Sequence, residues 1–191
     1  MYENIREKMK FGDVISFSGK CDISNIIKWK TNSDISHVGM VLDTEIIKGQ
    51  KRIVLIESTS LVNIPDLRTK ELIKGVQQHH LSQRLSSYQG QAYYHELINP
   101  LTDGQKAAML SWLFDRHACK TPYDTAQAIG SSLDLFDKMG FENAPDYSSL
   151  FCSEMVAKAF EIAGIWEGNP SEQTPADVVA FGFLADRVQI K

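Results

Sequence analysis

The chain has 191 residues, of which 43% are hydrophobic and 23% are charged. These proportions are typical of one globular domain, spanning residues 1–191, with a buried core. The net charge is -4, and lysines and arginines are scattered between acidic residues. No basic stripe is available to neutralise a phosphate backbone, so we expect no nucleic-acid partner.

The first half of the chain is predicted to consist mostly of β-strands. Short runs rich in β-branched residues predict these strands, and clusters of polar and glycine residues predict the turns between them. The predicted strands cover residues 13–17, 35–42, 52–57, 76–81 and 91–97, with turns at 48–51 and 86–90.

The second half has helical periodicity. Apolar residues recur there at intervals of three and four, which places them on one face of a helix. The predicted helices run from a cap at Thr102 to about His117, from Asp124 or Thr125 to about Met139, and from Leu150 to Ala163. Because the strands precede the helices, we expect an α+β domain and not alternating βαβ units.

The three cysteines are too few and too scattered for a disulfide framework or a zinc site. Residues 1–10 are too charged for the apolar part of a signal peptide, and no stretch approaches the roughly 18 apolar residues of a membrane span. We expect a cytoplasmic protein without a transmembrane segment, although a precursor exported with a leader would have the same mature sequence.

Cys152 lies in a segment that predicts the start of a helix, with Ser149 as the N-cap. Free amide groups and the helix dipole at such an end stabilise negative charge, so a thiol there ionises more easily. The same amides could hold a developing oxyanion. The alternative is that Cys152 is a small buried residue of the helical core.

His37 and Glu57 are polar residues in two neighbouring apolar strands. A pairing symmetric about Ile47 would place them directly opposite on one face, with Cβ atoms about 4.5 to 5.5 Å apart. The carboxylate could then orient the imidazole. A tighter turn at Gly49 would break this parity, and either residue could instead have a structural or solvent-exposed role.

These residues resemble the permuted papain-like amidases, the YiiX and YaeF group related to NlpC-type cell-wall peptidases. Ordinary papain-like chains have the order Cys, His, polar residue, whereas here the order is His37, Glu57, Cys152. The motifs that carry the resemblance are Gly12-Asp-Val-Ile-Ser-Phe17, Ser36-His-Val-Gly-Met40, Ile56-Glu-Ser58, Pro122-Tyr-Asp124, Phe151-Cys-Ser-Glu-Met-Val156 and Thr174-Pro-Ala-Asp177.

The resemblance implies an antiparallel sheet packed against helices, one of which carries the nucleophile. It implies that Cys152 is the nucleophile, His37 the base and Glu57 the residue that orients the base. Tyr123 could supply a hydroxyl at the oxyanion site, although the glycine usual before this tyrosine is absent here.

The expected reaction is hydrolysis of an amide in a peptide, peptidoglycan fragment or lipid amide, through an acyl-enzyme and without a cofactor. Acyl transfer from the same acyl-enzyme is an alternative, and a binding module that has lost the chemistry is another. A metal site built from His79, His80 and His95 is a third, which lacks a complete ligand set. The sequence does not indicate an oligomeric state.

Overall fold

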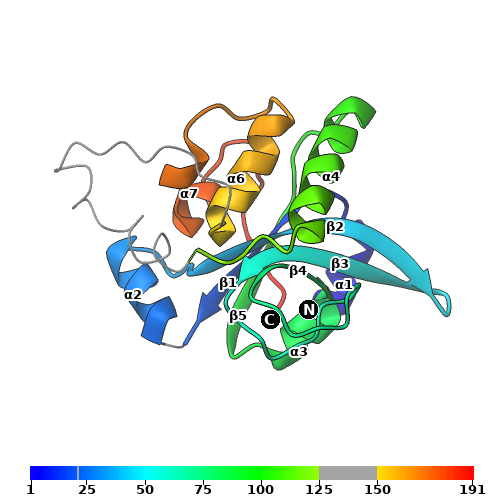
Figure 1. Cartoon of the computed structure of the whole chain (residues 1–191), viewed down its shortest axis with the longest axis horizontal. Helices are drawn as coiled ribbons and strands as arrows, with labels where there is room; N and C mark the ends of the chain where they lie inside the picture. Colours follow the sequence, from blue (N-terminus) through cyan, green and yellow to red (C-terminus); the bar gives the residue numbers. More distant parts are fainter. Residues whose placement is uncertain (21, 125–149) are drawn as a thin grey trace.

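The computed structural model describes residues 1–20, 22–124 and 150–191. It has an α+β fold built on a six-stranded antiparallel sheet, in the order β4-β3-β2-β1-β5-β6 (Figure 1). The predicted α+β class and antiparallel sheet are confirmed. The strands are β1 (Val14–Gly19), β2 (His37–Ile47), β3 (Gln50–Thr59), β4 (Gly75–His80), β5 (Gly90–His95) and β6 (Val188–Gln189).

Helices cover both faces of the sheet. In Figure 1, α4, α6 and α7 lie on one side of the sheet, and α1 and α3 lie on the other. The α-helices are α1 (Tyr2–Ile5), α2 (Asp22–Lys30), α3 (Leu81–Ser87), α4 (Asp103–Ala118), α6 (Cys152–Ile162) and α7 (Pro175–Val179). Short 3-10 turns occupy Arg6–Lys8 and Pro170–Glu172.

Two hydrophobic cores follow from this arrangement, one on each face. Val14 packs into the core that includes α4 and α6, whereas its neighbour Ile15 packs into the core that includes α3. Successive side chains of a strand point to opposite faces, so a strand covered on both sides is apolar throughout. This explains why the central strands appear in the sequence as continuous apolar runs.

The hairpin of β2 and β3 has a different register from the predicted one. A two-residue turn at Lys48 and Gly49, both with positive φ, pairs Ile47 with Gln50. That turn alone would place His37 and Glu57 on opposite faces. An irregularity at Leu42 shifts the register by one residue and returns them to one face, as β-bulges do.

The expectation that His37 directly faces Glu57 is therefore wrong. Beyond the bulge, Met40 pairs with Ile56, so Gly39 is the residue beside Glu57. A Cβ on Gly39 would lie only 3.1 Å from the Cβ of Glu57. Glycine at this position leaves the space that the Glu57 side chain occupies.

Four segments differ from the prediction or extend outside the described residues. Helices α2 (residues 22–30) and α3 (residues 81–87) are absent from the prediction, because stretches of nine and seven residues have too few turns to show helical periodicity clearly. Helix α6 begins at Cys152 with Phe151 at the N-cap, and Ser149 lies outside the described residues. The helix predicted over residues 124–139 also lies outside them from residue 125 onwards.

The predicted cap of the long helix is confirmed. The Thr102 hydroxyl accepts a hydrogen bond from the Gln105 amide, and the Gln105 side chain accepts one from the Thr102 amide. This reciprocal pair satisfies two groups that a helix start leaves without partners. Within the described part of the chain, no helix is long and apolar enough to span a membrane.

Asp66 joins the loop after β3 to β4 and α4. Its carboxylate accepts hydrogen bonds from the amides of Arg68, Thr69 and Gln78 and from Nε2 of His117. Burial raises the pKa of this carboxyl, but the hydrogen bonds outweigh burial and lower the pKa to about 2. The ionised group therefore stabilises the fold.

Asp66→Asn is expected to lower the free energy of unfolding by about 1 to 3 kcal/mol at neutral pH, because buried donors lose a charged acceptor. The folded pKa lies below the ordinary 3.8. The contribution of the Asp66 carboxylate to the free energy of unfolding is thus present above about pH 4 and is lost as the pH falls towards 2. Urea titrations at several pH values should show the difference from wild type shrinking in acid. The exposed Asp186→Asn is the control, and an equal effect of both variants would contradict this role.

Candidate active site

Glu57 is a completely buried carboxylate on β3 with three basic side chains around it. Arg84 donates from Nε to Oε1 at 2.6 Å and from Nη2 to Oε2 at 3.2 Å. His37 Nε2 lies 2.6 Å from Oε2, and His79 Nδ1 lies 3.3 Å from Oε1. Burial raises the pKa of Glu57, but Arg84 and the two histidines bring it well below its ordinary value. Glu57 is ionised.

His37 lies between Glu57 and Cys152. Since Nε2 contacts Glu57, the hydrogen bond between the His37 and Cys152 side chains uses the other ring nitrogen. Burial lowers the pKa of His37, but the interactions with Cys152 and Glu57 outweigh burial and raise it to about 9. At neutral pH both ring nitrogens are therefore protonated and the ring is positively charged.

Cys152 is the first residue of α6, and its side chain is buried. Glu154 stabilises this end of the helix, since its carboxylate accepts a hydrogen bond from the Phe151 amide at 3.3 Å. The Ser58 hydroxyl donates to the Leu150 carbonyl at 2.7 Å. Strand β3 thus holds both Glu57 and, through the next residue, the segment that leads into Cys152.

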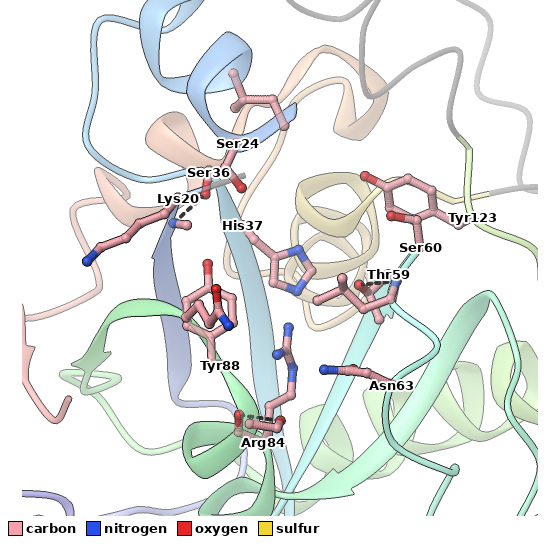
Figure 2. A pocket seen from close by; sticks show the side chains of 15 residues that line it. Lys20, Ser24, Ser36, His37, Thr59, Ser60, Asn63, Arg84, Tyr88 and Tyr123 are labelled. Carbon is pink, nitrogen blue, oxygen red and sulfur yellow. Dashed lines mark hydrogen bonds between the residues drawn. The ribbon is translucent and has the colours of Figure 1, made fainter. Parts of the chain in front are cut away.

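A pocket of about 410 Å³ opens beside these residues. His37 and Tyr123 both line it, and Figure 2 shows Tyr123 on the opposite side of the pocket from Lys20. Tyr123 is positioned by a parallel bridge to Leu150 and by its ring, whose centroid lies 5.9 Å from that of Phe151. The remaining lining residues come from the end of β1 and the residue after it, α2, the residue before β2, the end of β3 and the loop after it, and α3 and the residues after it.

The structure brings together the three residues predicted as a triad, with Tyr123 in the wall of the adjoining pocket. Sequence reasoning missed Arg84 and His79, the other partners of Glu57. No local motif marks either residue, because their role depends on α3 and β4 packing beside β3. Only the odd position of Glu57 in an apolar strand indicated that a buried cation was needed.

The three histidines considered as a metal site lie apart. His79 contacts Glu57, His80 lies 4.0 Å from a Glu45 oxygen, and His95 Nε2 lies 2.8 Å from the Ser16 hydroxyl. Among the described residues, no three His, Cys, Asp or Glu side chains are arranged to hold a metal ion.

Comparison with known proteins finds similarity only at the level of structure. No protein-family model matches the chain, and no curated protein matches its sequence. The crystal structure described as metalloprotein yiiX from Escherichia coli O157:H7, DUF1105, matches with a TM-score of 0.60 and 17% sequence identity. The match covers 94% of this chain and 96% of that one. At this identity the similarity establishes a shared, YiiX-like fold.

The raised pKa of His37 predicts how its ring titrates in wild type and in Cys152→Ala. An NMR titration of wild type should show this ring titrating near pH 9. Protonated His37 contributes stability that is fully present below pH 6.5 and is lost as the pH rises through about 9. Cys152→Ala removes one of the interactions that raise the pKa, so the titration should move to lower pH. An unchanged titration in this variant would mean that the thiol does not interact with the ring.

Proposed function

We propose that the chain is a cysteine-dependent hydrolase of the permuted papain-like, NlpC-type class, acting on an amide through an acyl-enzyme on Cys152. The observation that carries the proposal is the continuous series of contacts from the Cys152 side chain through His37 to an ionised Glu57. A nucleophile, a base and a group that orients the base are the parts that this chemistry needs.

In the proposed reaction, the Cys152 proton already resides on His37 at neutral pH, and the thiolate sulfur attacks the carbonyl carbon. The carbon–nitrogen bond then breaks, and the leaving amine takes the proton from His37, which leaves a thioester. Water attacks the thioester, His37 removes its proton, and the acid and free thiol are released. The first amides of α6 and the Tyr123 hydroxyl are the candidate donors to the oxyanion.

Glu57 has two roles in this proposal. Its contact with His37 Nε2 fixes the ring so that the other nitrogen faces Cys152, and its charge stabilises the imidazolium. Arg84 and His79 hold the carboxylate in place and keep it ionised. A pocket of about 410 Å³ suits a small amide, a peptide end or part of a lipid amide. The same acyl-enzyme would also serve acyl transfer.

A binding module is the second candidate, and one observation favours it. Cys152 is buried and is not among the residues that line the pocket, whereas His37 is. A substrate carbonyl must reach the sulfur for catalysis. Access to the Cys152 sulfur is therefore the property that separates an enzyme from a module that only binds.

The yiiX structure is described as that of a metalloprotein, but the residues here do not fit a metal. Both oxygens of Glu57 already accept hydrogen bonds from Arg84, whose positive charge would oppose a cation at the same oxygens. The two histidines at Glu57 direct ring nitrogens to the carboxylate. No step of the proposed mechanism passes through a metal.

Cys152 is expected to react faster than the other thiols, because it alone combines a helix N-terminus with a base. Iodoacetamide at neutral pH, followed by peptide mapping, measures the rate at each cysteine. His37→Gln should slow alkylation of Cys152 and leave that of the exposed Cys119 unchanged. Cys119→Ala is the matched control and should leave the Cys152 rate unchanged.

Intact-mass analysis after incubation with peptide and acyl amides would identify a trapped acyl-enzyme, and Cys152→Ala should abolish the adduct and turnover. A Cys152 that resists alkylation while Cys119 reacts would contradict the enzyme and favour the binding module.

Glu57→Gln is expected to lower both stability and the Cys152 alkylation rate. A neutral amide leaves the Arg84 guanidinium buried without a counter-charge, and breaking a buried pair costs about 3 to 5 kcal/mol. The amide also no longer stabilises protonated His37. Thermal melting and alkylation kinetics on the same protein measure the two effects. An unchanged alkylation rate would mean that another residue orients His37.

A further inference from the structure

Arg84 has one nitrogen that the contacts with Glu57 do not use. The residue is 1% exposed, and Nη1 has no hydrogen-bond partner among the described residues. A buried guanidinium nitrogen without a partner costs free energy, because it has lost its hydrogen bonds to water. Arg84 is also one of the residues that line the pocket. A ligand in the pocket could therefore supply the missing acceptor.

The direction of the guanidinium is fixed by its surroundings. The Arg84 Cζ atom lies 5.0 Å from the ring centroid of Phe17 and 4.9 Å from that of Tyr88. The hydrogen bonds to Glu57 hold the other two nitrogens. Figure 2 shows the guanidinium pointing into the space between His37, Asn63 and Tyr88. The donor is thus preorganised towards the pocket.

The charge of the pocket also favours an anion. Its described lining residues include two permanent cations, Lys20 and Arg84, and no aspartate or glutamate. Glu57, behind the lining, balances the charge of Arg84. His37 is also protonated, and in the proposed function the Cys152 thiolate balances its charge. Lys20 then leaves about one uncompensated positive charge, which matches a singly charged carboxylate better than a doubly charged phosphate.

We propose that Arg84 Nη1 binds a free carboxylate of the substrate, and this rests on the proposed function of the site. The guanidinium and the His37 ring both contact Oε2 of Glu57, so they are neighbours. A carboxylate bound at Nη1 lies close to the reacting centre. The scissile amide is then the one next to a free carboxylate, as in N-acyl amino acids and the last bond of a peptide.

Two matched probes test this inference: N-benzoylglycine, which has a free carboxylate, and its neutral amide, N-benzoylglycinamide. Calorimetric titration of Cys152→Ala protein measures binding without turnover. The acid is expected to bind about tenfold more tightly than the amide, since a hydrogen bond to a charged group is lost in the amide. Equal affinities, or binding of neither probe at millimolar concentration, would overturn the proposal.

The variant Asn63→Asp provides a test that leaves the Glu57 pair intact. Asn63 is exposed in the pocket wall and points towards Arg84 (Figure 2), so a carboxylate there should compete for Nη1 and repel the probe. The preference for the acid should fall at least threefold. This corresponds to about 0.7 kcal/mol, which is typical of an interaction with an exposed charge. Asn99→Asp makes the same charge change outside the pocket and should preserve the preference. Retention of the full preference in Asn63→Asp would overturn the proposal.

Arg84→Lys gives an independent test, because the single nitrogen of lysine cannot occupy both the positions beside Glu57 and the position of Nη1. It should remove most of the preference for the acid, with melting temperature recorded alongside. Failure of the carboxylate inference and failure of the proposed function would give different results. Loss of the acid preference leaves the reactivity of Cys152 as evidence for the enzyme, whereas an inert Cys152 leaves the binding preference intact.

Discussion

The ionised carboxylate of Glu57 inside the sheet is the constraint on which the rest of the site depends. A buried charge without partners would cost several kcal/mol, so the fold must bring cations to it. Arg84 arrives from α3, His79 from β4 and His37 from β2. Three elements are thus tied to one side chain. The same contacts that make burial tolerable also fix the ring that faces Cys152.

Backbone geometry makes these contacts possible. The two-residue turn of the β2–β3 hairpin is compact but gives the wrong parity, and the bulge at Leu42 corrects it. Gly39 then leaves room beside the Glu57 side chain. One irregularity in β2 therefore sets both the pairing of β2 with β3 and the geometry of the site.

In the proposed function, the same network would connect catalysis with recognition. Arg84 uses two nitrogens to hold Glu57 and presents the third to the pocket, so one residue links the orientation of His37 to the proposed carboxylate of the substrate. Ser58 extends the same strand towards the start of α6 through Leu150. Strand β3 thus contacts His37 and Arg84 through Glu57, and the segment before Cys152 through Ser58.

The sequence by itself determined the α+β class, most strands, the Thr102 cap and the three residues that meet at the site. These follow from local periodicity, from capping patterns and from polar residues in apolar strands, which need partners for physical reasons. Only the tertiary structure decided the register of His37 and Glu57, since one bulged residue reverses which side chains share a face. It alone identified Arg84 and His79, because a buried charge indicates that a partner exists but not which distant segment provides it.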